Sequence, residues 1–511
     1  MKNTMKKALS LLLALGITLS LAACAAGGEK ESEPVLMVPA TQPDYSDETL
    51  APIYTRPQEN EESGDISVEN PEGGDVIEPE DPEYDPEADP NGEGESGGGS
   101  SSGGASADTD TGDTFADGSV SSNMQGSAKN LNWTNINSFK IKSSSMSVAE
   151  MRKLCVDFFR FAKTALWTPD ESISYIRNSN GVKDSMQGGS LYGGLPYVGL
   201  ASGNIYRLMD YLDTNNGKVD MADALNLSGG TMDMAVLKYF GNQCANGAFT
   251  GWGRVINSVT HHYTAGMTKK NGYLPVGNYQ YDFSISSWSN KDGKRTTDVV
   301  QANGEQVMFE SYALLKMGDG LVYYTSAGHV IMAATDAVVV RNADGTINGN
   351  DSYITIIDQA QSWESQTSGG KTFQYKSSVD AKVSFKKLFS SNYLPFTFAE
   401  FQGTDPVEST SVSISVNGAS VTLAQLYKAT VTGNYAVSDA YIIVKDASGK
   451  EAFKHAVRNS SNWGKTLKMA ATGANVDFWG TAPTSGSYTV EVVAQLSTGE
   501  RPTIYSGQLA F

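Results

Sequence analysis

Residues 241–259 read G-N-Q-C-A-N-G-A-F-T-G-W-G-R-V-I-N-S-V and contain Cys244, one of three cysteines in the 511-residue chain. Apolar residues behind the cysteine recur at helical spacing, which predicts a helix that begins at Cys244 and runs to the end of the stretch. These residues are Ala248, Trp252, Ile256 and Val259. A thiol in the first turn of a helix faces unpaired N–H groups and the positive end of the helix dipole, and both favour the nucleophilic thiolate. The competing interpretation is a small buried core residue, the usual role of a free cysteine.

A second block, K-M-G-D-G-L-V-Y-Y-T-S-A-G-H-V-I-M-A-A at residues 316–334, is typical of two short strands joined by a turn. His329 stands at the start of the second predicted strand, and D-A-V-V-V at 336–340 is expected to continue or follow it. The run S-Y-I-T-I-I-D-Q at 352–359 predicts a further strand that ends in an acid and an amide. The chain order is therefore helix-starting cysteine, strand-starting histidine and strand-ending carboxylate.

This order resembles the papain-like superfamily of cysteine hydrolases, specifically its NlpC-like and CHAP branches. Gly318-Asp319 and the G-H-V of residues 328–330 match the family's histidine block, and N-Q-C-A-N-G-A-F-T-G-W is closer to the cysteine block of CHAP than to the D-C-S-G of NlpC. The resemblance covers about residues 147–359. It implies an α+β fold of helices and an antiparallel sheet, and a peptidase or amidase that needs no cofactor and no metal.

The resemblance also implies roles for individual residues. Cys244 is the expected nucleophile, His329 the expected proton carrier, and Asp358 the expected group that orients the imidazole. Gln359 is the alternative to Asp358, because a one-residue slip of the strand would exchange their faces. Each residue also has an ordinary structural interpretation: His329 as a strand-end histidine, and Asp358 as a strand-terminating acid.

Further support for the reaction is expected around the cysteine. Backbone N–H groups near Cys244, with Gln243, are candidates to hold the oxyanion. An upstream tyrosine often lies near the cysteine in this superfamily, and both Tyr192 and Tyr197 fit, in the glycine-rich passage 187–200.

The remaining features of this region are interpreted as structural. A helix is predicted over about residues 147–166, with Cys155 on its core face, and a second helix over 203–212. A Cys155–Cys244 disulfide stays open as an alternative that would block the thiol chemistry. Residues 271–298 are expected to form loops or irregular strands.

Two potential ligand motifs are interpreted in the same way. The run D-T-N-N-G-K-V-D-M-A-D from Asp213 is assigned to a turn, because its glycine falls fifth and Ala224 twelfth in a calcium-loop register. His261 and His262 are expected at the end of the Cys244 helix, where the dipole favours histidine.

The first 130 residues predict export and anchoring. A basic start and an apolar run end in Leu21-Ala22-Ala23-Cys24, which resembles the lipobox of bacterial lipoproteins and implies a signal peptide at 1–23 and lipidation of Cys24. An ordinary signal cut nearby is the alternative. Residues 24–130 predict a disordered tether rich in acidic, Gly, Ser and Pro residues.

The acidic charge belongs to this tether. Between Glu29 and Asp117 it carries 26 acidic residues against Lys30 and Arg56, whereas the whole chain has a net charge of −19. The remainder is slightly basic, so the low pI describes the tether alone. We expect no nucleic-acid partner, and a monomer.

Residues 404–511 predict an all-β immunoglobulin-like sandwich that follows the hydrolase domain at 131–403. Alternating runs, including T-L-A-Q-L-Y-K-A-T-V at 422–431, recur with turns between them, and Asn417-Gly418 favours a hairpin. The expected function is a surface-anchored cysteine peptidase or amidase, projecting from the extracytoplasmic face of the membrane into the cell wall and hydrolysing amide bonds of peptidoglycan. The alternative is a non-catalytic surface binding or adhesion lipoprotein with an inactive papain-like domain.

Overall fold

The computed structural model describes residues 131–511, apart from 142–144, 177–182, 199–202, 215–217, 220–225, 228–234, 237–240, 260, 291–292, 326–327, 361–363, 369–370, 376–378, 404–406, 460–463 and 472–475. The predicted signal peptide with Cys24, the tether, and most of the Asp213 turn lie outside the described residues. Within them, no helix combines the length and the apolar character needed to cross a membrane.

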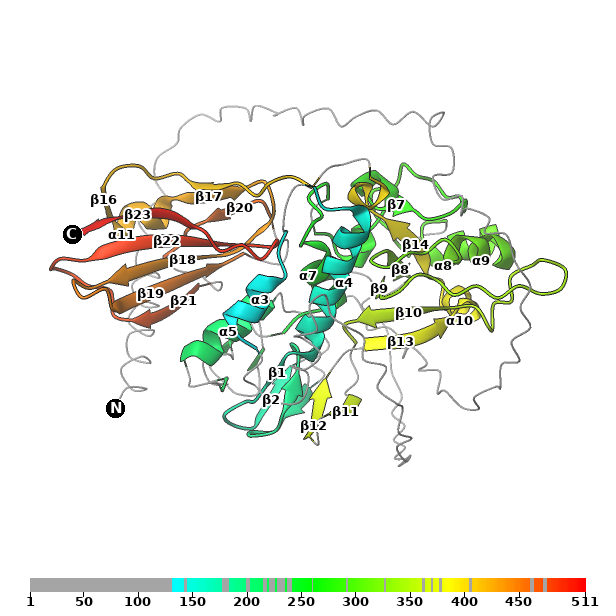
Figure 1. The fold of residues 1–511 in the computed structure, drawn as a ribbon, viewed down its shortest axis with the longest axis horizontal. Helices are drawn as coiled ribbons and strands as arrows, with labels where there is room; N and C mark the ends of the chain where they lie inside the picture. The colour runs from blue at the N-terminus through cyan, green and yellow to red at the C-terminus, as the bar shows by residue number, and fades with distance from the viewer. Residues whose placement is uncertain are drawn as a thin grey trace, which may run out of the picture. The chain divides into compact units, whose positions relative to one another are not determined.

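A six-stranded antiparallel sheet forms the centre of the N-terminal α+β region (Figure 1). Its strand order is β13-β10-β9-β8-β14-β7. The strands are β7 (Leu274–Pro275), β8 (Gly320–Tyr324), β9 (Gly328–Ala333), β10 (Tyr353–Asp358), β13 (Val379–Ser384) and β14 (Leu394–Thr397). The three strands predicted around His329 and Asp358 therefore exist and are hydrogen-bonded neighbours, whereas residues 336–340 form only an isolated bridge at Val338.

Two helices, α4 (Val148–Thr164) and α7 (Cys244–Trp252), pack on each other, and α7 also contacts β9 and β10. The capping box of Ser147 and Glu150 starts α4, because each side chain satisfies a backbone N–H of the other. The buried Arg152 of α4 donates to the Asp319 carboxylate at 2.8 Å, and thereby ties the helix to the turn before β8.

The helix that begins at Cys244 is shorter than its apolar pattern predicts. It ends at Trp252, with Gly253 as its C-cap, so His261 and His262 lie beyond it in irregular chain. The expectation that the helix dipole favours these histidines is therefore wrong. His261 is instead a buried residue, and burial lowers its pKa to about 3, with a smaller contribution from His262.

Gly251 allows the close approach of α7 to α4. A Cβ atom at this position would lie 2.7 Å from the Cys155 carbonyl oxygen and 2.9 Å from Cβ of Phe159. We expect Gly251→Ala to lower the free energy of unfolding by about 1–3 kcal/mol, because the backbone of α4 must shift. Gly464→Ala is the matched control, since a Cβ there meets nothing closer than 3.7 Å. Equal urea midpoints for both variants would contradict this packing.

Smaller elements surround the central sheet. The helices are α3 (Trp133–Ser138), α5 (Ile205–Thr214), α8 (Thr296–Asn303), α9 (Glu305–Tyr312), α10 (Phe385–Ser390), η3 (Thr264–Gly266), η4 (Lys269–Asn271) and η5 (Ala399–Gln402). The strands are β1 (Leu166–Trp167), β2 (Ile173–Ile176), β3 (Lys183–Met186), β4 (Tyr192–Gly193), β5 (Asn226–Leu227), β6 (Ala235–Val236), β11 (Glu364–Ser368) and β12 (Lys371–Tyr375). Helix α4 contributes side chains to two hydrophobic clusters, one with α7 and the central sheet and one with α3, β1 and α5.

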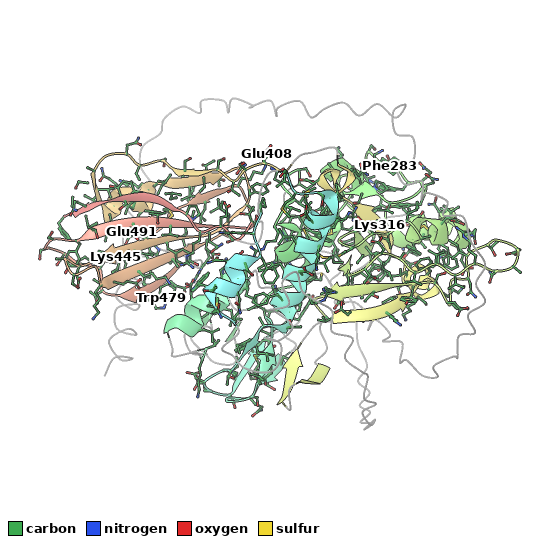
Figure 2. All side chains as sticks on the ribbon, in the orientation of Figure 1. Phe283, Lys316, Glu408, Lys445, Trp479 and Glu491 are labelled. Atoms are coloured by element: carbon green, nitrogen blue, oxygen red, sulfur yellow. The ribbon has the colours of Figure 1, made fainter. Side chains whose placement is uncertain are left out.

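The C-terminal part is β-rich and sandwich-like, with a three-stranded sheet β15-β17-β20 and a six-stranded sheet β16-β23-β22-β18-β19-β21 (Figure 1). Its elements are β15 (Val412–Ile414), β16 (Ser420–Thr422), α11 (Leu423–Lys428), β17 (Thr430–Gly433), β18 (Val437–Lys445), β19 (Glu451–Arg458), β20 (Thr466–Lys468), β21 (Val476–Gly480), β22 (Thr489–Leu496) and β23 (Thr503–Ala510). On the six-stranded sheet, Lys445 and Glu491 form an ion pair of 2.7 Å, and Trp479 is half-buried (Figure 2).

Two details of this part differ from the sequence prediction. Residues 422–431 do not form a strand, because Thr422 and Gln425 make a capping box that starts α11. Asn417-Gly418 does not join paired strands, since β15 pairs with β17 while β16 pairs with β23, in parallel.

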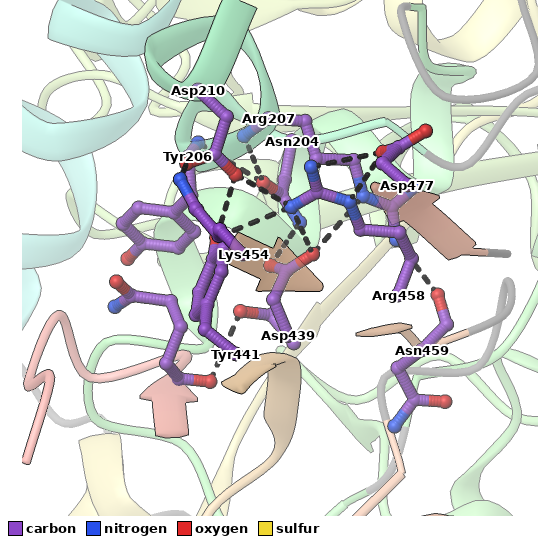
Figure 3. A network of polar contacts seen from close by, with 12 residues as sticks. Asn204, Tyr206, Arg207, Asp210, Asp439, Tyr441, Lys454, Arg458, Asn459 and Asp477 are labelled. Carbon is purple, nitrogen blue, oxygen red and sulfur yellow. Dashed lines mark hydrogen bonds and ion pairs between the residues drawn. The ribbon is translucent and has the colours of Figure 1, made fainter. Parts of the chain in front are cut away.

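A buried network of charges links α5 to the six-stranded C-terminal sheet (Figure 3). Asp210 accepts hydrogen bonds from Arg458 at 2.7 Å and from Lys454 and the Tyr441 hydroxyl at 2.9 Å. Asp439 in turn accepts from Arg207 at 3.2 Å. Because these groups are buried, the C-terminal part is held against α5 by directional contacts.

Candidate active site

Cys244 is the first residue of α7, as predicted, and is 3% exposed. Gln243 is the N-cap residue, and its side chain makes no capping hydrogen bond to the first turn. The chain enters this turn beside residues 196–198: the Asn242 N–H donates to the Pro196 carbonyl at 3.1 Å, and the Val198 N–H donates to the Asn242 carbonyl at 3.0 Å. The first turn of α7 therefore presents its N–H groups next to the thiol.

His329 and Asp358 lie on neighbouring antiparallel strands. Asp358 is opposite Ile331 in the register of β9 and β10, so Asp358 and His329 share one face of the sheet. The distance from Nε2 of His329 to Oδ2 of Asp358 is 3.0 Å. The Asp358 carboxylate is nearly buried, whereas the imidazole retains 19% exposure.

The imidazole also interacts with the thiol. Cys244 contributes to raising the pKa of His329, and the Cys244 thiol donates to the carbonyl oxygen of the adjacent Gly328 at 3.9 Å. Because Asp358 occupies Nε2, the ring nitrogen left for sulfur is Nδ1. Close packing fixes this strand start, since a Cβ atom on Gly328 would collide with the Thr264 side chain.

The electrostatics of the site favour a protonated imidazole. Burial lowers the pKa of His329, but the hydrogen bonds and charges of Asp358 and Cys244 outweigh it and raise the pKa to about 10. An imidazolium between two anion-forming groups is the arrangement that a thiolate–imidazolium pair requires.

The alternative partner for the imidazole is placed elsewhere. Gln359 is fully buried, and its Nε2 donates to the Leu195 carbonyl at 3.2 Å. The register of β10 with β9 therefore puts Asp358, not Gln359, against His329.

The two tyrosine candidates occupy different positions. Tyr197 is buried and bridges to Asn242, two residues before Cys244. Tyr192 lies in β4, packs on Trp167, and its hydroxyl accepts the Gln187 N–H at 2.8 Å. Of the two, Tyr197 is the one that flanks the chain entering the cysteine turn.

Sequence reasoning missed two residues near the site. Lys163, at the end of α4, is 1% exposed, and the charges of Asp358 and Cys244 favour its protonated form. Tyr393 is 5% exposed, and burial, followed by the charges of Asp358 and Cys244, raises its pKa well above the usual value. The only sequence signal for Lys163 was a lysine within the otherwise apolar end of a helix.

The other motif residues have structural partners. Cys155 and Cys244 are both free thiols, so the disulfide alternative is absent from the described structure. Burial raises the pKa of Cys155 far above its usual range, against the opposing charges of Arg152 and Arg254. The carbonyl of Gly318 accepts the Trp252 indole N–H at 2.7 Å, which anchors the end of α7 to the Gly-Asp turn.

Comparisons of the chain with protein-family models, with curated proteins and with solved structures found no match.

Proposed function

We propose that this chain is a cysteine peptidase or amidase in which Cys244 is the nucleophile, His329 the proton carrier and Asp358 the group that orients the imidazole. The observation that carries the proposal is the convergence of the three groups: His329 contacts Asp358 at 3.0 Å, and the thiol of Cys244, which starts α7, lies 3.9 Å from the carbonyl oxygen of Gly328, the residue before His329. These residues come from three separate elements, and no single sequence motif brings them together.

The reaction follows from these contacts. The thiolate of Cys244 attacks the carbonyl carbon of an amide, and first-turn N–H groups of α7, with Gln243, receive the developing oxyanion. The His329 imidazolium gives its proton to the leaving nitrogen as the C–N bond breaks, which leaves an acyl-thioester on Cys244. Water then attacks the thioester, gives a proton to His329, and the C–S bond breaks to return the thiolate.

The finer assignments belong to the same proposal. A papain-like, NlpC- or CHAP-type domain is supported by the order of the three residues and by the antiparallel sheet that carries two of them. An immunoglobulin-like C-terminal domain is supported by its two packed sheets. The lipobox at Cys24 and the acidic tether favour anchoring on the extracytoplasmic membrane face, and peptidoglycan as the nearest amide-rich substrate.

The pH dependence of hydrolysis follows from His329. Its pKa is raised from 6.5 to about 10, so the imidazolium persists through neutral pH and is lost as the pH rises through 10. We therefore expect the rate of amide hydrolysis to fall above about pH 10. The contact between His329 and Asp358 should stabilise the fold less over the same pH range. Initial rates between pH 6 and 11, with circular dichroism to confirm folding, would show this. A fall centred near pH 6.5 would contradict the charge state assigned here.

The substrate is tested by incubating the chain with purified peptidoglycan beside its Cys244→Ala variant. New amines and shortened stem peptides should appear only with the parent, and mass spectrometry of the products identifies the bond cut. Absence of release by the parent, with Cys244 reactive toward alkylation, would exclude peptidoglycan as the substrate. Absence of both release and thiol reactivity would favour the non-catalytic binding protein.

A further inference from the structure

Lys163 is a buried cation behind the candidate site. It lies in the last turn of α4, and its side chain is shielded from solvent. Helix α4 packs on α7, which in turn contacts β9, the strand that carries His329. Its ammonium lies 5.4 Å from the centre of the Phe159 ring, which covers it from the same helix. Burying an ammonium is costly unless charges or hydrogen bonds compensate it.

The ammonium points at the first turn of α7. Its Nζ is 3.4 Å from the position that a Cβ atom on Gly247 would take, and the Gln359 side chain lies 2.9 Å from the same position. Gly247 therefore allows the close approach of Gln359, and the Lys163 ammonium lies beside the same point. Lys163 thus adjoins both the helix turn of Cys244 and the end of β10, where Gln359 follows Asp358.

The groups that compensate this cation belong to the candidate site. Among the described residues, the Lys163 ammonium forms no hydrogen bond or ion pair. The titratable groups whose charges reach it are Asp358 from β10 and Cys244 from α7, and both favour its protonated form. His329 interacts with both of these anion-forming groups. Two groups that can be cations, Lys163 and His329, therefore interact with the same two groups that can be anions.

We propose that Lys163 is a positioning residue for the thiol chemistry: from the end of α4 it supplies a second positive charge, in addition to the His329 imidazolium, that favours negative charge on the Cys244 sulfur during the reaction. This inference rests on the proposed function. With Lys163 protonated, two cations face two anions. With Lys163 neutral, the four side chains together carry one uncompensated negative charge in a buried site. The thiolate form of Cys244 then becomes less favourable.

Lys163 also sets the pH at which this balance changes. Burial lowers its pKa to about 7, against the opposing effects of Asp358 and Cys244. Its charge is therefore present below pH 7 and lost as the pH rises above it. The contribution of Lys163 to thiol reactivity should be large in mild acid and absent in mild base.

The test is the rate at which iodoacetamide alkylates Cys244 in the full chain between pH 5.5 and 9, read by mass spectrometry of the Cys244 peptide. Lys163→Met removes the charge at similar volume, and Lys163→Gln provides a second neutral variant in case methionine disturbs folding. Lys153→Met is the matched control, because Lys153 lies on the same helix with a side chain 40% exposed and paired with Asp157. Thermal unfolding confirms that each variant is folded.

We expect Lys163→Met and Lys163→Gln to slow alkylation about tenfold at pH 6, and to match the parent above about pH 8. Lys153→Met should follow the parent at every pH. Neutral variants that match the parent throughout, or that are slower by one constant factor at every pH, would overturn the inference. A different outcome would contradict the proposed function itself: Cys244 of the parent as unreactive as Cys155. That outcome would also remove the basis of this inference.

Discussion

His329→Ala is expected to lower the rate of amide hydrolysis at pH 7 by at least about 1,000-fold, the largest loss of activity expected from any residue other than Cys244. In the proposed mechanism the imidazole supplies the leaving-group proton and interacts with the thiol, and alanine can do neither. The side chain stands at a strand start and is partly exposed, so the fold should tolerate its removal. Product release by chromatography and thermal unfolding measure the two effects.

His262→Ala is the matched control for this prediction. His262 is half-buried, lies outside the site, and has a ring nitrogen 3.4 Å from the Tyr273 hydroxyl. We expect its activity to stay within about threefold of the parent, as for an ordinary surface substitution. Parent-like hydrolysis by a folded His329→Ala variant would remove the histidine from the mechanism.

Asp210→Ala is expected to lower the free energy of unfolding by about 3–5 kcal/mol, the largest stability loss among these substitutions. Asp210 is fully buried, and its removal leaves Arg458 and Lys454 without their shared carboxylate (Figure 3). Asp477→Ala is the control, because Asp477 is partly exposed and contacts the outer side of Arg458 at 3.1 Å. We expect a loss of about 1 kcal/mol for that variant in urea titrations.

The same carboxylate predicts acid sensitivity. Burial raises the pKa of Asp210, but Arg458 and Lys454 outweigh it and bring the pKa to about 2. A lowered pKa means that the contribution to stability is present above the unfolded value of 3.8, and is lost as the pH falls towards 2. The unfolding free energies of the parent and Asp210→Ala, from urea titrations, should therefore approach each other as the pH falls from 4 to 2. A constant difference between them at every pH would argue against this ion pair.

This network also changes the interpretation of the C-terminal part. Sequence alone predicts only that a sandwich at residues 404–511 follows the hydrolase domain. Arg207 and Asp210 on α5 meet Asp439 and Arg458 on β18 and β19 in buried ion pairs, so the two regions are coupled mechanically. The relevant polar residues alternate along the strands with core residues, a pattern that the sequence shows without indicating the partner.

Local signals predicted the elements of the candidate site well. The helix start at Cys244, the strand that starts at His329 and the β-branched run that ends in Asp358 depend on nearby residues, and the structure has all three. The choice between Asp358 and Gln359 depended on strand register, which sequence does not fix. Lys163 lies beside the first turn of α7 at Gly247, and sequence does not indicate such a tertiary contact.

Two elements differ from the sequence prediction for reasons found in nearby residues. The apolar spacing predicts that the Cys244 helix continues to Val259, but the helix ends at Trp252, with Gly253 as its C-cap. The apolar residues after Thr422 predict a strand. The capping box of Thr422 and Gln425 instead starts helix α11 there.

The central claim is that Cys244 is a nucleophile activated by His329, and its most direct measurement is alkylation of the folded chain by iodoacetamide at pH 6. Cys155, fully buried, serves as the internal reference in the same sample. The account predicts that Cys244 is modified at least about 100-fold faster than Cys155, and that His329→Ala removes most of this advantage. Equal, slow modification of both cysteines, or an unchanged Cys244 rate in His329→Ala, would contradict it.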